Sequence, residues 1–352
     1  MRVRLEDVCE KESSKLKQSD VIDQNGLYPV YGASGYLGSI NTYQQSNYYV
    51  AVVKDGAGIG RTMLLPPKSS IIGTMQYLIP KDNVQPEYLY YVVKAKHLEK
   101  YFSGATIPHI YFKDYKNEQF DLVSFEKQRD IINRLKKIEI IIDSLSKILV
   151  LLDELVRARF VEMFGDVQDA KKHSNKQLKD ICNTVTGGTP STKHAEYYNG
   201  TIPWISTVSL GSNYIDGTTA KAFITQEAVD NSSTKIIPSG SILFGTRVGV
   251  GKSSINQVEM CTNQDIVAII DLDESKYNKL YIKYVLDTYQ SYFDSIKKGA
   301  TILGISSDDL KNIYIPDASL YEQNRFEKFV KQIDKSRLLN NHSLFLIKSI
   351  IL

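Results

Sequence analysis

The chain has 352 residues, of which 42% are hydrophobic and 24% are charged, and its formal net charge is +3 at pH 7. These values are typical of globular proteins with more than one domain, and they exclude wholesale disorder. A dedicated non-specific nucleic-acid binder would be more basic. If this chain binds DNA, its positive side chains must gather on one face, or partner proteins must supply charge.

The cysteines and histidines predict neither a metal site nor a disulfide framework. Cys9, Cys182 and Cys261 are scattered, and no Cys-x-x-Cys pair or Cys/His cluster occurs. The N-terminus has no apolar signal segment, and the most apolar stretch, residues 138–156, carries five charged side chains. We therefore expect no membrane span and a cytoplasmic location.

The first part of the chain, residues 1–125, predicts a domain of short strands. Residues 1–25 look degenerate as the start of a strand-rich domain, and we expect them to lack an ordinary first strand. Apolar runs at 48–53, 71–72 and 76–79 are bounded by glycine, proline and asparagine, which is typical of strands joined by turns. A short helix is expected at 87–102.

A long spacer helix is expected next, over residues 126–164. Its apolar residues recur at alternating steps of four and three, which is the heptad seam of a coiled coil. Gly165 follows and can end the helix. The predicted seam consists of Ile131, Leu135, Ile138, Ile142, Leu145, Leu149, Leu152 and Val156.

Residues 165–319 return to the strand-rich pattern. Strands are expected at 241–244 and 265–270, and a short helix at 278–293. Each strand-rich part therefore predicts an α+β domain with a mainly antiparallel sheet.

A second long helix is expected over residues 320–352. Arg337 and Asn340 interrupt the middle of its apolar seam, where buried polar residues often set register. The alternative is that the helix faces water at these two positions. The apolar seam residues are Phe326, Val330, Ile333, Leu344 and Ile347.

The two halves of the chain resemble each other in sequence. Ser103–Asn117 and Lys298–Asn312 are identical at eight of fifteen positions, at a constant offset of 195. Gly58–Arg61 likewise matches Gly249–Lys252. This period is far too long for a solenoid repeat and indicates a duplicated domain.

Tests for catalytic motifs are negative or weak. Gly245–Ser253 resembles a phosphate loop, but Thr246 stands where that loop requires glycine. Asp265, Glu274 and Lys276 weakly resemble the carboxylate–lysine set of metal-dependent nucleases. No amino-methyltransferase, serine-hydrolase or zinc-protease motif is visible. This pattern favours a binding protein without catalysis of its own.

Several segments, taken in order, resemble the target-recognition domains and spacer helices of type I restriction-modification specificity subunits. No single one of them is specific, but the ordered set covers essentially the whole chain. The segments are Tyr28–Gly35, the helix start at Glu126, Gly187–Ser191, Tyr197–Ile205, Gly249–Lys252 and the helix start at Tyr321.

This resemblance implies two DNA-reading domains, each followed by a long helix, with the two helices paired as an antiparallel coiled coil. It implies that each domain reads one half of a bipartite, asymmetric double-stranded DNA target. It also implies two kinds of partner. Modification subunits would carry S-adenosylmethionine, and restriction subunits would carry ATP-dependent translocation and cleavage with magnesium. No cofactor is expected on this chain itself.

The candidates for DNA contact are basic side chains in loops, together with one histidine. Arg61, Arg247 and Lys252 lie beside glycines, where the backbone can approach DNA closely. Such side chains can bind either guanine edges or phosphates, and surface charge is the alternative reading. The counterpart of His109 is Gly304, so its role would be specific to the first domain. The full set is Lys54, Arg61, His109, Lys193, Arg247 and Lys252.

Two other functions stay open at this point. One is a metal-dependent nuclease with an unrecognised site, which metal-dependent nicking by the pure chain would reveal. The other is a coiled-coil scaffold with two protein-binding domains, which the absence of any DNA footprint would favour.

Overall fold

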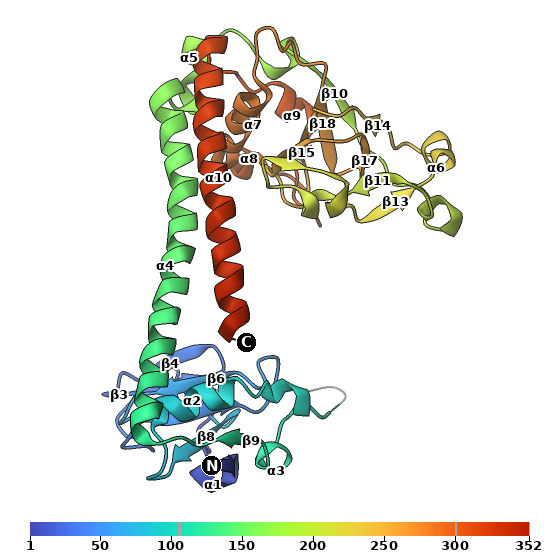
Figure 1. The fold of residues 1–352 in the computed structure, drawn as a ribbon. Helices are drawn as coiled ribbons and strands as arrows, with labels where there is room; N and C mark the ends of the chain where they lie inside the picture. Colours follow the sequence, from blue (N-terminus) through green and yellow to red (C-terminus); the bar gives the residue numbers. More distant parts are fainter. Residues whose placement is uncertain (105–107, 300, 352) are drawn as a thin grey trace. The chain divides into compact units, whose positions relative to one another are not determined.

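A computed structural model describes residues 1–104, 108–299 and 301–351 (Figure 1). The fold combines helices and sheets, as the predicted α+β class requires. It divides into two compact units, one formed by Met1–Ser146 with the chain from His342 onward, the other by Lys147–Asn341. Thr106 and Ala300, in the repeated segment, lie outside the described residues.

Unit 1 contains two sheets, and one of its apolar clusters includes residues from both of them. The larger has the strand order β2-β8-β5-β6 and is antiparallel, and the smaller has the order β4-β3-β7. A separate two-stranded sheet, formed by β1 and β9, joins the N-terminus to the end of the domain. The strands are β1 Arg2–Arg4, β2 Cys9–Ser13, β3 Tyr28–Gly32, β4 Gly35–Ile40, β5 Tyr49–Val53, β6 Thr62–Leu65, β7 Ser70–Ile71, β8 Met75–Pro80 and β9 Gln119–Asp121. The helices are α1 Leu5–Val8, α2 Pro86–Lys94 and α3 Phe112–Tyr115.

Unit 2 is built in the same way. One sheet has the order β10-β18-β15-β16-β12 and the other β13-β11-β17-β14. The strands are β10 Asn183–Thr186, β11 Ile202–Ile205, β12 Tyr214–Ile215, β13 Ala222–Ile224, β14 Ile236–Ile237, β15 Ile242–Gly245, β16 Ser253–Asn256, β17 Met260–Thr262 and β18 Ile266–Ile270. The helices are α5 Ala170–His173, α6 Gln226–Asp230, α7 Lys279–Thr288, α8 Gln290–Ile296 and α9 Ser307–Lys311.

The duplication seen in the sequence is therefore also present in the topology. The order β2-β8-β5-β6 matches β10-β18-β15-β16, and β4-β3-β7 matches β13-β11-β17. The central strand of each smaller sheet runs parallel to its later neighbour, β3 with β7 and β11 with β17. Gly26 and Gly200 hold equivalent places, since a Cβ on either would lie 2.0 Å from backbone atoms of Ile40 or Ile224.

The expectation of a missing first strand was wrong. Residues 1–25 contain β1 and β2, and Leu5–Cys9 matches the Leu178–Cys182 segment of unit 2. The Cys9 thiol donates to the Leu5 carbonyl at 3.2 Å, and the Cys182 thiol donates to the Leu178 carbonyl at 3.1 Å. The offset here is 173 rather than 195, so a search at the longer period misses the match.

Of the two short helices, the first was predicted too long and the second was predicted as one helix where the structure has two. The first ends at Lys94, because His97 adopts a left-handed conformation with φ of 49° before the 3-10 turn Leu98–Tyr101. Left-handed backbone cannot continue an α-helix. The second divides at Tyr289 into α7 and α8.

Two long helices, α4 Phe125–Phe164 and α10 Leu320–Ile351, follow the two sheet-containing parts of the chain. Gly165 ends α4 with φ of 78°, and its N–H bonds the Val161 carbonyl at 2.8 Å. Within unit 2, α4 and α10 lie side by side (Figure 1), and Phe326 packs edge-on against Phe160, with ring centroids 5.4 Å apart.

Between Ile138 and Val156, the heptad positions of α4 are less exposed than the apolar side chains beside them. Val156 is buried, and the other seven seam residues are half-buried. Apolar side chains off the seam are exposed instead, namely Ile140, Ile141, Ile148, Val150, Leu151 and Leu155.

A buried glutamine joins the start of each long helix to its own domain. Gln128 of α4 accepts a bond from the Gln85 N–H at 2.8 Å and donates to the Asn83 and Val123 carbonyls at 3.2 and 3.0 Å. Gln85 is the N-cap of α2. The amide side chain thus ties together a turn, the start of α2 and the start of α4.

The same arrangement recurs in unit 2. Gln323 of α10 accepts from the Asn278 N–H at 2.8 Å, and it donates to the Lys276 and Ala318 carbonyls at 3.1 and 2.9 Å. Asn278 is the N-cap of α7. Gln128 is 0% exposed and Gln323 is 1% exposed, so neither side chain can exchange these bonds for water.

Replacing Gln323 by alanine should lower the free energy of unfolding by about 1–3 kcal/mol, because the deletion leaves buried backbone groups without partners. Urea denaturation of the purified chain measures this loss. Gln332→Ala, at an exposed position on the same helix, is the matched control and should change stability by less than about 0.5 kcal/mol. Equal, small effects of the two substitutions would show that the hydrogen bonds of Gln323 do not stabilise the fold.

Candidate nucleic-acid interface

The glycine-rich loop between β5 and β6 is closed by two backbone hydrogen bonds. The Val53 N–H donates to the Arg61 carbonyl at 2.9 Å, and the Gly60 N–H donates to the Val53 carbonyl at 2.9 Å. Gly60 has φ of 81°, a conformation that favours glycine. The loop therefore holds Arg61, which is exposed, at its closing end.

Unit 2 repeats this closure between β15 and β16. The Gly245 N–H donates to the Lys252 carbonyl at 2.9 Å, and the Gly251 N–H donates to the Gly245 carbonyl at 3.0 Å. Gly251 has φ of 90°. Lys252 thus stands where Arg61 stands in unit 1, so both loops present an exposed cation at the same structural position.

A second segment is fastened to each loop by backbone bonds. Ser103 and His109 bond each other in both directions at 2.8 Å, and the Ile110 N–H donates to the Lys54 carbonyl at 2.9 Å. In unit 2, Lys298 and Gly304 bond each other at 2.8 and 2.9 Å. There the Ile305 N–H donates to the Thr246 carbonyl at 2.8 Å.

We call this arrangement the loop pair. In unit 1 it consists of residues 54–61 with Ser103 and His109, and in unit 2 of residues 246–252 with Lys298 and Gly304. Glycine allows a backbone to approach a ligand closely, and an exposed cation beside it suits contact with an anionic polymer.

The side chains of the unit 1 loop pair are linked to one another. His109 Nδ1 lies 2.7 Å from Asp55 Oδ1, and Lys54 forms an ion pair with the same carboxylate. Arg61 donates to the Ala33 carbonyl at 2.7 Å. Three predicted candidates, Lys54, Arg61 and His109, are thereby brought together in one loop pair.

The unit 2 loop pair contains the predicted Arg247 and Lys252. The Arg247 side chain is 57% exposed and lies 3.7 Å from the Asp265 carboxylate. It borders a hollow of about 530 Å³ that Lys298 and Ser306 also line. This arginine is therefore loosely held and able to reach a ligand.

Lys193 does not belong to either loop pair. It is exposed in the turn that follows the Gly-Gly-Thr-Pro segment, and its N–H lies 3.4 Å from the Ser191 hydroxyl. The two glycines of that segment are required by close packing, since a Cβ on Gly187 or Gly188 would come within 2.4 Å of neighbouring atoms.

Sequence reasoning missed Asp55, which is the anionic centre of the unit 1 loop pair. The search for DNA contacts looked only for basic residues and histidine. An alignment of the two copies outward from Val53 and Gly245 would have found it, because Asp55 then falls opposite Arg247.

The segments that weakly resembled catalytic motifs have ordinary structural roles. The Gly245–Ser253 stretch turns between two antiparallel strands, whereas a phosphate loop leads from a strand into a helix. Glu274 pairs with Lys279 at 2.8 Å, and Lys276 pairs with Asp273 at 2.8 Å. Within residues 1–104, 108–299 and 301–351, no group of three or more His, Cys, Asp or Glu side chains could hold a metal ion.

The three thiols are unsuited to nucleophilic chemistry. Burial raises the pKa of Cys9 and of Cys182 to about 12, and that of Cys261 to about 11. A thiol with so high a pKa stays protonated at neutral pH, and the thiolate is the reactive form. Among the helices described, none is both long and apolar enough to cross a membrane.

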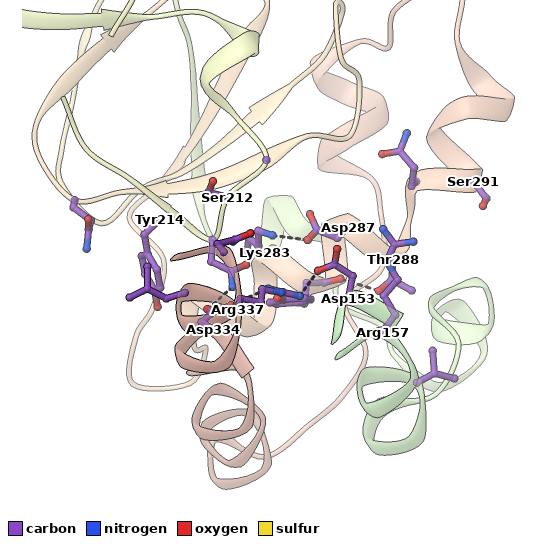
Figure 2. Close-up of a pocket in the computed structure, with 18 residues that line it drawn as sticks. Asp153, Arg157, Ser212, Tyr214, Lys283, Asp287, Thr288, Ser291, Asp334 and Arg337 are labelled. Atoms are coloured by element: carbon purple, nitrogen blue, oxygen red, sulfur yellow. Dashed lines mark hydrogen bonds and ion pairs between the residues drawn. The ribbon is translucent and has the colours of Figure 1, made fainter. Parts of the chain in front are cut away.

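A polar hollow of about 990 Å³ lies beside the paired helices of unit 2 (Figure 2). Arg337 of α10 forms ion pairs with Asp153 of α4 and with Asp334, the latter at 2.8 Å. Asn213, from the loop before β12, donates to Asp334 at 2.7 Å. These contacts connect α10 to α4, and they connect α10 to the loop before β12 in the sheet-containing part of unit 2.

A family model described as the type I restriction modification DNA specificity domain matches residues 1–153 and 171–348. The chain belongs to this family. Two similar curated proteins are specificity subunits of type I restriction enzymes. MjaIX of Methanocaldococcus jannaschii is 34% identical over 160 residues, which is 45% of this chain and 37% of that protein. EcoR124I/EcoR124II of Escherichia coli is 32% identical over 169 residues, 45% of this chain and 40% of that protein.

These alignments span less than half the length of each curated specificity subunit. Solved structures support the fold over the whole chain. A type I S subunit from M. genitalium aligns with a TM-score of 0.56 at 14% identity, covering 100% of this chain and 93% of that one. A chain from a structure on assembly and conformational transition of the type I system aligns with a TM-score of 0.58 at 16% identity, covering 100% and 95%.

The loop of unit 1 offers a matched pair of substitutions. Gly60→Ala should lower the free energy of unfolding by about 1–3 kcal/mol, because φ is 81° and the new Cβ would lie 2.6 Å from the Glu99 backbone nitrogen. Gly58→Ala meets only ordinary contacts from 3.7 Å outward and should be nearly neutral. Thermal unfolding of both variants measures the difference, and equal stability would show that the loop is not held in this conformation.

Proposed function

We propose that this chain is the DNA-reading specificity subunit of a type I restriction-modification complex, without catalysis of its own. The observation that carries the proposal is the loop pair, which occurs twice on the same two-sheet scaffold and presents Arg61 in one copy and Lys252 in the other. Two equivalent basic loops suit a protein that contacts one polyanion at two places.

In this proposal the chain has four parts. Residues 1–125 form the first target-recognition domain and 165–319 the second. Residues 126–164 and 320–352 are spacer helices that pair as an antiparallel coiled coil. Each domain reads one half of a bipartite, asymmetric double-stranded DNA target.

Partner subunits supply the chemistry in this account. Modification subunits bind S-adenosylmethionine and methylate the target, while restriction subunits bind ATP and magnesium and cleave DNA. The names of the curated relatives and the family membership support this assignment. The contribution of this chain is to choose the sequence on which both partners act.

Selection from random DNA tests the proposal. The chain is assembled with modification subunits of a type I system, and bound fragments are recovered from a randomised duplex pool and sequenced. The proposal predicts two short fixed motifs separated by a spacer of any sequence. Metal-dependent nicking by the pure chain would favour a nuclease instead, and recovery of no motif at all would favour a protein-binding scaffold.

The two domains should act as separable readers. Replacing residues 166–319 by the second domain of another family member should change one half of the selected motif and leave the other half intact, because each domain has its own cores and its own loop pair. The same DNA selection measures this. A folded chimera that selects neither original half would contradict modular reading.

The spacer helices should set the distance between the half-sites. The predicted seam from Ile131 to Val156 covers roughly 38 Å at about 1.5 Å per residue, close to the roughly 34 Å of one B-DNA turn. One heptad inserted after Ser146 and another after Leu344 should lengthen the rod by about 10 Å. Ser146 and Leu344 lie one heptad from Asp153 and Arg337, which form an ion pair, so the insertions face each other.

At about 3.4 Å per base pair, the added length alone corresponds to about three base pairs. The variant complex should therefore select a longer spacer between unchanged half-sites. A single insertion in α4 only, which breaks the match between the helices, is the control and should weaken binding. Selection of the original spacer by the doubly extended variant would show that the helices do not set the distance between the half-sites.

A further inference from the structure

The two loop pairs share a backbone but carry opposite charges at one position. In unit 1, the Lys54 N–H donates to the Thr74 carbonyl at 3.0 Å and the Lys54 carbonyl accepts from Ile110. In unit 2, the Thr246 N–H donates to the Asp265 carbonyl at 2.8 Å and the Thr246 carbonyl accepts from Ile305. The next residue is Asp55 in unit 1 and Arg247 in unit 2, so these two side chains leave equivalent points of the scaffold.

The residue that lies beside Asp55 or Arg247 in the second segment also differs between the two units. His109 and Gly304 make the same two-way backbone bond in their units. His109 fills the space beside Asp55 and lies 2.7 Å from its carboxylate. At Gly304 the corresponding space is taken by Arg247 itself, since a Cβ there would lie only 2.9 Å from Arg247 Cγ and 2.8 Å from the Thr246 carbonyl oxygen. One copy therefore pairs an acid with an imidazole, while the other pairs a guanidinium with a glycine.

The residue that closes each loop, in contrast, is positively charged in both units. Arg61 and Lys252 are both cations, although the two domains differ in most of their residues. Phosphates are the same in every DNA sequence, whereas base edges differ between half-sites. A position that keeps its positive charge suits a phosphate contact, and a position that reverses its charge suits a base contact. A carboxylate facing DNA would be repelled by phosphates, and it can gain only from a base that donates a hydrogen bond.

We propose that Asp55 and Arg247 are the equivalent base-reading positions of the two domains, an inference that rests on the proposed function. Arg247 donates two hydrogen bonds to O6 and N7 of a guanine in the major groove. Asp55, held by His109 and Lys54, accepts from the exocyclic amino group of a cytosine or adenine. Arg61 and Lys252 bind phosphate and carry no sequence information.

The test is the DNA selection with the assembled complex and four variants. Arg247→Gln should move one position of one half-site from guanine toward adenine, which glutamine contacts bidentately, with a change in base preference of about 5- to 150-fold. Asp55→Asn should relax one position of the other half-site. Arg61→Gln and Lys252→Gln are matched controls that should lower affinity for every sequence and leave both motifs unchanged.

Arg247→Lys separates the two roles of a cation at this position. If Arg247 reads guanine, lysine keeps the charge but loses the planar fork, so selectivity should fall while affinity for mismatched DNA is kept. If Arg247 only bound phosphate, the selected motif would be unchanged in both Arg247 variants, and that outcome overturns the inference. Unchanged motifs in Asp55→Asn would overturn it for the first domain. If the unmodified complex selects no bipartite sequence, it is the proposed function that fails.

Discussion

Two buried glutamines set the geometry on which the rest of the structure depends. Gln128 and Gln323 each satisfy a helix N-terminus, a turn and the start of a long helix at once, with almost no exposed surface. A buried amide is costly to leave without its hydrogen bonds, so each glutamine holds the start of the long helix against its own domain. Because both units use the same hydrogen bonds, each long helix begins at an equivalent place on its own unit.

If the loop pairs read DNA as proposed, one scaffold accommodates two specificities through them. Backbone hydrogen bonds and positive-φ glycines hold the loops, so the side chains between them are free to differ. The Asp55–His109 pair and the Arg247–Gly304 pair differ in charge and volume without disturbing those bonds. Separating the residues that hold a loop from those that read a ligand allows one reading position to change without refolding the domain.

Much of this could be predicted from the sequence, for physical reasons that also explain the failures. Both long helices and the duplication follow from period, turn residues and repeated segments, and so do the strands β5, β7, β8, β15 and β18. The helix 87–102 was predicted too long because the left-handed turn at His97 leaves no trace in composition. Asp55 was missed because its role depends on His109, 54 residues away, and only tertiary hydrogen bonding brings the two together.

Amide hydrogen exchange of the assembled complex, with and without its selected DNA, tests the central claim most directly. The claim is that both loop pairs face the DNA. Exchange in peptides covering residues 54–61 and 246–252 should slow on DNA binding, while exchange around Gln128 and Gln323, which are already buried, should stay the same. DNA binding without protection in either loop would contradict the account.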